Sequence, residues 1–206
     1  MASMDNTYGP WAAEFEAFKT ADAKRRPAEG GVLFTGSSSI RLWHTLARDL
    51  PRHAVINRGF GGSRVIDSVE HVDLLVLQYR PRVVVLYAGG NDLAQGMTAE
   101  AIANDVDSFF QRVHSALPNA QIGLIQHTLQ PARRPLWPAV REMTRLEKNL
   151  VAQDPRRYFI SVGAPLENPN GEPDADCFVA DKIHLSRKGY AAWTLAVNAW
   201  LDRLPV

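Results

Sequence analysis

Side chains that could carry out chemistry follow the apolar runs of this sequence, which are its candidate strands. In chain order, these segments are residues 36–39 (GSSS), 57–62 (NRGFGG), 89–92 (GGND) and 126–128 (QHT), and the pair Asp181 and His184 after a fifth run. A serine, glycine amides, an asparagine and an Asp–His pair are together the parts of a nucleophilic acyl-transfer site. The segments therefore predict acyl transfer if the fold brings them together.

Each segment has a simpler structural interpretation when it is considered alone. A serine run before a helix is most often an N-cap, and a pair such as Gly61-Gly62 commonly forms a turn. Asp181 and His184 could be a surface pair or two metal ligands, but the sequence contains neither a third ligand nearby nor an HExxH pattern. The prediction of a catalytic site therefore depends on the joint placement of the segments.

His184 is the strongest candidate for the catalytic base. It is the only histidine with a carboxylate three residues upstream, Asp181, which could hold one ring nitrogen. His127 also follows a candidate strand but has no acid nearby, so it is the second choice. Cys177 could form a Cys–His nucleophile, although a lone cysteine is more often a small packing residue.

The elements that must position these residues alternate between strand and helix. We predict strands at residues 32–36, 54–57, 82–88, 122–125 and 158–162, and helices at 11–25, 40–50, 64–78, 98–117, 138–153 and 186–204. Alternation of this kind indicates a parallel sheet covered on both faces. We therefore expect one α/β domain over residues 1–206, with an N-terminal helix in residues 1–26 packed on it. The carboxyl ends of parallel strands meet at one edge, where chemistry is usually found.

Composition narrows the class of protein further. The 206 residues include 23 Lys and Arg and 22 Asp and Glu, and a net charge of +1 argues against a nucleic-acid binder. A single cysteine excludes an internal disulfide framework and a Cys-based zinc site. No apolar run approaches the ~20 residues needed to cross a bilayer. We expect a cytoplasmic protein, which could form a homo-oligomer.

Four segments in a fixed order resemble the sequence blocks of the SGNH hydrolases, also called GDSL-type lipases and esterases. Residues 36–43 (GSSSIRLW) resemble the first block, 57–62 the second, 89–92 the third, and 181–185 (DKIHL) the last. The serine and tryptophan of the first block are most similar to acetylhydrolase-like members. The resemblance implies a three-layer α/β/α sandwich, flavodoxin-like, with a five-stranded central parallel sheet.

The resemblance also implies a role for each matching residue. Ser38 corresponds to the nucleophile, His184 to the general base and acid, and Asp181 to the residue that orients the imidazole. The oxyanion hole corresponds to the backbone N–H of Ser38, the backbone N–H of Gly62 and the side-chain amide of Asn91. No metal or organic cofactor is implied. In members whose first block reads GDS, an aspartate occupies the position of Ser37. That aspartate is not the triad acid, so the change to serine affects local hydrogen bonding and not the triad. The α/β-hydrolase fold is a weak alternative. Its nucleophile motif is G-x-S-x-G, and Ile40 occupies the position of the second glycine.

Substrate contacts are predicted in a proline-rich loop at residues 129–138. Trp137 could form an apolar wall, and Arg133 or Arg134 could meet a polar substrate, although a solvated loop is an equal alternative. Phe60 could limit the pocket or pack beneath the turn. The predicted function is hydrolysis of small, short-chain acyl esters, acetyl esters above all, through an acyl-enzyme. Alternatives are an acyltransferase or a carbohydrate or lipid deacetylase with the same triad and, from another class, a non-catalytic module that binds acylated sugars or lipids.

Overall fold

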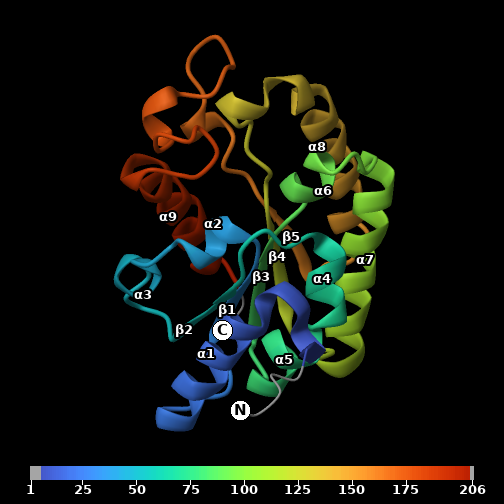
Figure 1. Ribbon diagram of the computed structural model, residues 1–206, viewed down its shortest axis with the longest axis vertical. Coiled ribbons are helices and arrows are strands. Elements are labelled where there is room, and N and C mark those ends of the chain that lie inside the picture. The colour runs from blue at the N-terminus through green and yellow to red at the C-terminus, as the bar shows by residue number, and fades with distance from the viewer. Residues whose placement is uncertain (1–5, 205–206) are drawn as a thin grey trace.

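Five short apolar runs pair as parallel strands in the computed structural model, which describes residues 6–204 (Figure 1). The strands are β1 (Val32–Gly36), β2 (Val55–Gly59), β3 (Val83–Tyr87), β4 (Gln121–Ile125) and β5 (Arg157–Ile160). Their order in the sheet is β2-β1-β3-β4-β5, which is the flavodoxin-like order. The predicted fold class is confirmed. In this order, β1 lies between β2 and β3, so the first three chemistry-bearing segments leave adjacent strands.

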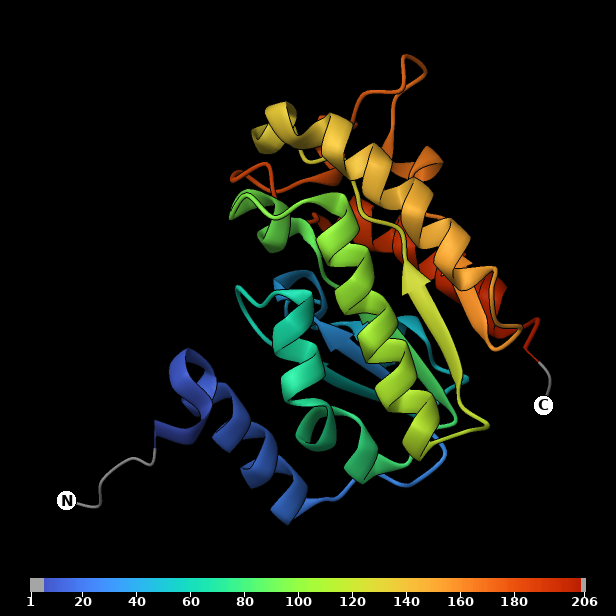
Figure 2. The same ribbon diagram turned by 90° about the vertical axis from the view of Figure 1, so that its right-hand side faces the viewer.

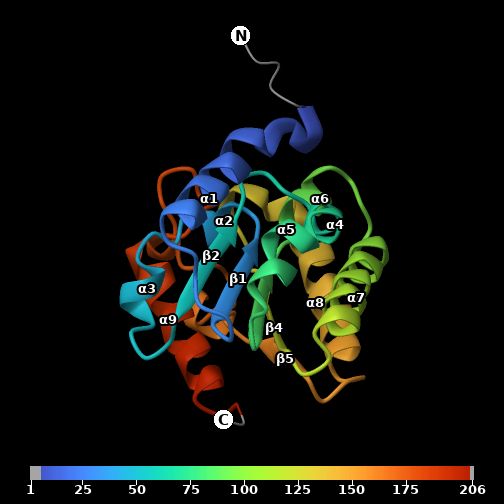
Figure 3. The same cartoon turned by 90° about the horizontal axis from the view of Figure 1, so that it is seen from below.

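Helices cover both faces of the sheet because alternate strand residues point to opposite sides (Figure 3). On one face, Leu33, Val84 and Ile122 pack in a core with residues of α4, α7 and α8. On the other face, Phe34, Val85 and Ile125 pack with residues of α2 and α9. The helices are α1 (Ala12–Lys24), α2 (Ser38–Arg41), α3 (Leu46–Asp49), α4 (Val65–Glu70), α5 (Val72–Leu75), α6 (Gly90–Ala94), α7 (Ala99–Ala116), α8 (Trp137–Val151) and α9 (Arg187–Leu201). Between residues 6 and 204, each helix is too short or too polar to cross a membrane.

Two of the predicted helices are broken in the structure. The expected helix over residues 40–50 is divided into α2 and α3, and that over 64–78 into α4, α5 and a short 3₁₀ helix at Leu77–Tyr79. The second segment is rich in β-branched residues, which stabilise a helix only weakly. The chain leaves helical geometry at His71 (φ −104°, ψ 17°) and at Val76 (φ −129°, ψ −60°), while Val72 and Val76 both stay buried in the core. By contrast, α7 agrees with the prediction to within one residue at each end, and Thr98 caps it by accepting from the N–H of Ala101.

The N-terminal helix α1 lies at the β2 side of the sheet (Figure 3), and Figure 2 shows it on the same side of the molecule as α4 and α5. Residues 1–5 of the predicted N-terminal segment lie outside the described residues. Asp22 of α1 accepts hydrogen bonds from the guanidinium of Arg58 on β2 and from the hydroxyl of Tyr79. The side chains of Arg58 and Asp22 are only 9% and 11% exposed, so this ion pair is nearly buried. It attaches α1 to the sheet.

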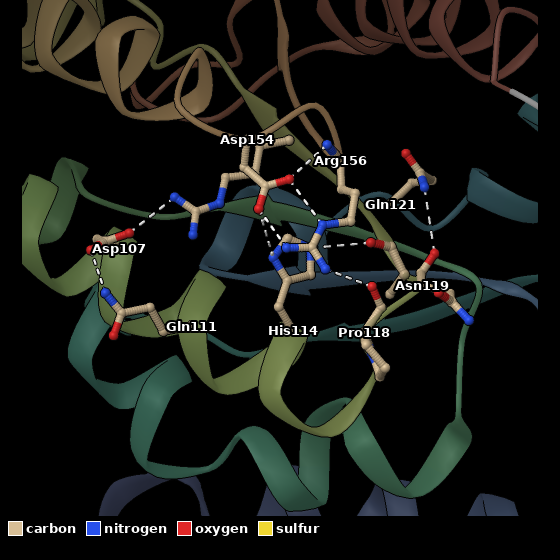
Figure 4. A network of polar contacts seen from close by, with 10 residues as sticks. Asp107, Gln111, His114, Pro118, Asn119, Gln121, Asp154 and Arg156 are labelled. Atoms are coloured by element: carbon tan, nitrogen blue, oxygen red, sulfur yellow. Dashed lines mark hydrogen bonds and ion pairs between the residues drawn. The ribbon is translucent and has the colours of Figure 1, made fainter.

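A polar network at the amino end of the sheet is structural (Figure 4). Asp154 pairs with Arg156, which also donates to the carbonyl of Pro118 at 2.6 Å. His114 lies 3.1 Å from the carbonyl of Ala120, and burial together with the nearby charge of Arg156 lowers its pKa. A neutral, buried His114 thus ties the end of α7 to the strands that follow, as expected for a packing histidine.

Candidate active site

Ser38, His184 and Asp181 form one chain of hydrogen bonds. Ser38 Oγ lies 2.8 Å from His184 Nε2, and His184 Nδ1 lies 2.7 Å from Asp181 Oδ2. An ionised carboxylate only accepts, so Nδ1 must carry the ring proton and Nε2 is free to accept from the Ser38 hydroxyl. This is the tautomer that a serine nucleophile requires. The tertiary fold brings the serine to a histidine that is 146 positions away in the sequence.

A tight loop holds Asp181 in its orientation. Its Oδ1 accepts from the backbone N–H of Ile183 at 2.8 Å and of His184 at 2.9 Å, which leaves Oδ2 for the imidazole. Partial burial raises the pKa of Asp181, but hydrogen bonds from the imidazole and the two amides outweigh it and lower the pKa to about 2. The carboxylate therefore stays ionised at neutral pH. It is also accessible: the Asp181 side chain is 45% exposed and that of His184 is 26% exposed.

The turn between β1 and α2 presents Ser38 at the carboxyl edge of the sheet. Gly36 has a φ of +118°, and a Cβ there would lie 2.1 Å from the carbonyl oxygen of Tyr87. That carbonyl accepts from the N–H of Ser37 at 2.9 Å, so only glycine permits this approach. Ser38 is the first residue of α2, where backbone amides lack acceptors within the helix. Because α2 has only four residues, these free amides matter more here than a helix dipole does.

Gly62 and Asn91 lie in neighbouring loops, Gly62 after β2 and Asn91 after β3. Gly62 has a φ of +71°, within a turn that follows Phe60, whose N–H donates to the carbonyl of Gly36 at 2.9 Å. Asn91, on α6, donates one amide hydrogen to the carbonyl of Ser63 at 3.0 Å. Among residues 6–204, its second amide hydrogen has no acceptor. In Figure 1, α2 and α6 lie at the same end of the sheet.

Two further residues hold this part of the site, and the sequence did not single out their roles. Asp92 is fully buried and accepts from the N–H of Val65 at 3.0 Å, and burial raises its pKa to about 6. Arg133, predicted to meet substrate, instead donates to the carbonyl of Gly90 at 2.8 Å and to Asn91 Oδ1 at 3.4 Å. Arg133 therefore orients the Asn91 amide. Only the position of Asp92 beside Asn91 in the GGND segment could have suggested its role.

Phe60 and Trp137, also predicted to contact substrate, are part of the packed interior. Phe60 is fully buried, and the ring of Trp11 meets it edge to face at 5.2 Å. Trp137 is 8% exposed and donates through Nε1 to the carbonyl of Gln130 at 2.9 Å. The cavity beside Trp137 has a volume of about 10 Å³, no more than one water molecule. Both side chains therefore support the loops of the site and do not line an acyl pocket.

The alternative base and the alternative nucleophile are both buried. His127 stacks on Tyr87 with ring centroids 4.8 Å apart, and burial, then the charge of Arg133, lowers its pKa to about 3. It does not face Ser38, whose partner is His184. Cys177 is fully buried, and burial raises the pKa of its thiol, which disfavours the nucleophilic thiolate.

Comparison with known proteins covers most of the chain. Residues 27–192 match the GDSL-like Lipase/Acylhydrolase family. None of the curated proteins matches the sequence. A GDSL-like lipase from Bacteroides thetaiotaomicron superposes with a TM-score of 0.76 at 18% identity, over 93% of this chain and 98% of that one.

Two carbohydrate esterases share the fold at similar identity. A family 3 carbohydrate esterase from Clostridium thermocellum has a TM-score of 0.67 at 17% identity, over 84% of this chain and 96% of its own. A variant of an acetyl-xylooligosaccharide esterase from Geobacillus has a TM-score of 0.69 at 15% identity, over 87% of this chain and 98% of its own. At such identities, these likenesses establish the fold.

Proposed function

Because this chain belongs to the GDSL-like lipase/acylhydrolase family, we propose that it is a serine esterase that hydrolyses short-chain acyl esters, acetyl esters above all. The observation that carries the proposal is the hydrogen-bonded chain Ser38–His184–Asp181, with distances of 2.8 and 2.7 Å. It supplies a nucleophile, a base in the required tautomer and a group that holds the base. The expected reaction is therefore two-step acyl transfer to water.

In the first step, Ser38 Oγ bonds to the ester carbonyl carbon while its proton passes to His184 Nε2. The carbonyl oxygen becomes an oxyanion that accepts from the N–H of Ser38, the N–H of Gly62 and the Asn91 amide. Collapse of the intermediate breaks the bond to the alcohol oxygen, which takes the proton from His184. Asp181 stays ionised throughout and stabilises the imidazolium.

In the second step, water loses a proton to His184 and attacks the acyl carbon. The same three donors stabilise the second oxyanion. Return of the proton to Ser38 Oγ releases the carboxylic acid and restores the enzyme. All protons are thus carried by residues of the hydrogen-bonded chain.

A small acyl group and a larger polar alcohol fit the surroundings of Ser38 best. The nearby aromatic residues Phe60 and Trp137 are packed in the interior, so they offer no long apolar channel. Exposed charges lie close to the triad: the Asp181 side chain is exposed, and Arg134 pairs with Glu172 at the surface, in a loop whose Ala132 N–H donates to the carbonyl of Lys182. Two fold relatives are described as carbohydrate esterases. We therefore propose acetylated carbohydrates as the first substrates to test.

The test uses p-nitrophenyl acetate, butyrate and octanoate together with acetylated xylo-oligosaccharides. We expect Ser38→Ala to lower kcat by at least about 10³, whereas the neighbouring Ser37→Ala, which removes a hydroxyl without a hydrogen-bond partner among residues 6–204, keeps near wild-type activity. Circular dichroism checks that both variants are folded. Hydrolysis that survives in Ser38→Ala would refute the assignment. Addition of an acceptor alcohol reveals any acyl transfer.

A further inference from the structure

We propose that Trp11 is a positioning residue for the oxyanion hole. Trp11 ends the 3₁₀ helix at Asn6–Trp11 and precedes α1, and it lies before residues 27–192, which match the family. The proposal rests on the proposed function, in which the N–H of Gly62 stabilises the oxyanion. It assigns part of the site to a segment that the family match does not include.

Both backbone groups of Gly61 are bound by the N-terminal segment. Trp11 Nε1 donates to the carbonyl oxygen of Gly61 at 2.8 Å. The N–H of Gly61 donates to the carboxylate of Glu14 on α1, with both oxygens at 3.3 Å. Glu14 also lies 3.3 Å from Arg41 Nε on α2, so its negative charge near the oxyanion is balanced. The segment thus contacts the loop of Gly62 and the helix of Ser38.

The bond from Trp11 acts directly on the N–H of Gly62. The carbonyl of Gly61 and the N–H of Gly62 belong to one planar peptide unit, and in a trans unit they point in opposite directions. No cis peptide bond occurs within residues 6–204. A donor that holds the Gly61 carbonyl from one side therefore sets the direction of the Gly62 N–H on the other. The same bond polarises the peptide unit and makes that N–H a stronger donor.

The loop needs such a restraint because of its composition. Two consecutive glycines allow many backbone conformations, and Gly62 has a φ of +71° with open space where a Cβ would stand, with no atom within 4 Å. The far side of the loop is held by α6, through Asn91 to the carbonyl of Ser63 and Asp92 to the N–H of Val65. Trp11 and Glu14 supply the restraint on the side of the loop that faces the N-terminal segment.

The indole of Trp11 is itself fixed by its neighbours. Its ring meets Phe60 edge to face at 5.2 Å and His71 at 6.0 Å, and it stacks on Phe15 at 6.5 Å. Phe60 directly precedes Gly61, so the Trp11 ring packs against the residue next to the loop. An immobile donor is what a preorganised oxyanion hole requires. Loss of this donor should therefore affect the transition state more than substrate binding.

The test compares Trp11→Phe with Trp200→Phe. Trp11→Phe keeps an aromatic ring and removes the Nε1 donor. Trp200→Phe makes the same change at a nearly buried indole against β4 and β5, whose Nε1 has no hydrogen-bond partner among residues 6–204. Loss of a whole oxyanion donor costs about 10²–10³ in kcat, so a misdirected donor should cost about 10-fold, with KM unchanged. We expect kcat of Trp200→Phe to stay within about 2-fold of wild type.

A second variant isolates the hydrogen bond if Trp11→Phe does not fold. Incorporation of β-(3-benzothienyl)alanine at position 11 replaces the indole N–H by sulfur and leaves the ring shape nearly unchanged. It should reproduce the roughly 10-fold loss of kcat. A kcat within about 2-fold of wild type in the folded position-11 variants would overturn the proposal. A raised KM with an unchanged kcat would overturn it as well.

NMR of protein labelled with ¹⁵N-glycine reports on the Gly61–Gly62 peptide unit independently of enzyme activity. The Gly62 amide nitrogen is bonded to the carbonyl carbon that Trp11 holds, so its resonance should shift in the position-11 variants and not in Trp200→Phe. An unmoved resonance would contradict the proposal. If the wild-type protein shows no Ser38-dependent turnover, the proposed function fails, and the Gly62 resonance alone decides whether Trp11 positions this amide.

Discussion

Replacement of Asp181 by asparagine should harm the enzyme more than replacement by alanine. Asp181 Oδ1 accepts two backbone N–H groups, at 2.8 and 2.9 Å, and Oδ2 accepts from His184 Nδ1 at 2.7 Å. Asparagine has one oxygen, and the two amides require it. Its NH₂ group must then face the imidazole, where it can only donate. The variant therefore forces the proton of His184 onto Nε2, and the ring can no longer accept from Ser38.

The magnitude follows from this tautomer. In a serine triad, asparagine at the acid position costs about 10⁴ in kcat, or about 5 kcal/mol. Alanine imposes no tautomer. Because the Asp181 side chain is 45% exposed, water can occupy the space and accept from Nδ1. The alanine variant loses the positioning and charge of the carboxylate but keeps a usable base, so we expect a loss of about 10².

The assay is kcat and KM on p-nitrophenyl acetate for both variants, together with ¹⁵N NMR of the imidazole. In Asp181→Asn, the Nε2 resonance should indicate a protonated nitrogen, and in Asp181→Ala an unprotonated fraction should be present. Asp176→Asn, at an exposed carboxylate in the same region of the chain, is the control and should leave kcat unchanged. An asparagine variant as active as the alanine variant would refute the reasoning.

Three other predictions concern the oxyanion hole and stability. Asn91→Ala should lower kcat by about 10²–10³ with little change in KM, measured on the same ester. Burial raises the pKa of Glu147 from 4.5 to about 8, so between these values the folded chain holds a proton that the unfolded chain has lost. The free energy of unfolding should therefore fall as pH rises through this window, by up to about 1.4 kcal/mol per pH unit relative to Glu147→Gln. Urea unfolding from about pH 5 to 8 measures this, and the same pH dependence in wild type and Glu147→Gln would contradict it. Asp22→Ala leaves Arg58 nearly buried without its partner and should cost about 3 kcal/mol in urea unfolding, whereas Glu142→Ala at an exposed pair should leave the urea midpoint nearly unchanged.

Much of the fold could be predicted from the sequence because its determinants are local. The run at Val83–Tyr87 is apolar at every position, and it forms a strand buried on both faces. The cap at Thr98 and the stop near Pro118 define α7 from neighbouring residues. Where local preference is weak, as in the valine-rich stretch before Tyr79, the predicted single helix is divided into α4, α5 and a short 3₁₀ helix. The family blocks also lie in short continuous segments, so they could be recognised without coordinates.

The parts of the site that depend on long-range contacts were not accessible in this way. Trp11 and Gly61 are 50 positions apart, and Arg133 and Asn91 are 42 positions apart, so no spacing in the sequence links them. Whether Phe60 and Trp137 face a substrate or the interior depends on which elements cover them, and both proved to be packed inside. The sequence by itself determined the strands, the order of the chemistry-bearing segments and the local Asp181–His184 pair. Only the tertiary structure decided which residues orient the others, because an orienting hydrogen bond depends on distance in space and not along the chain.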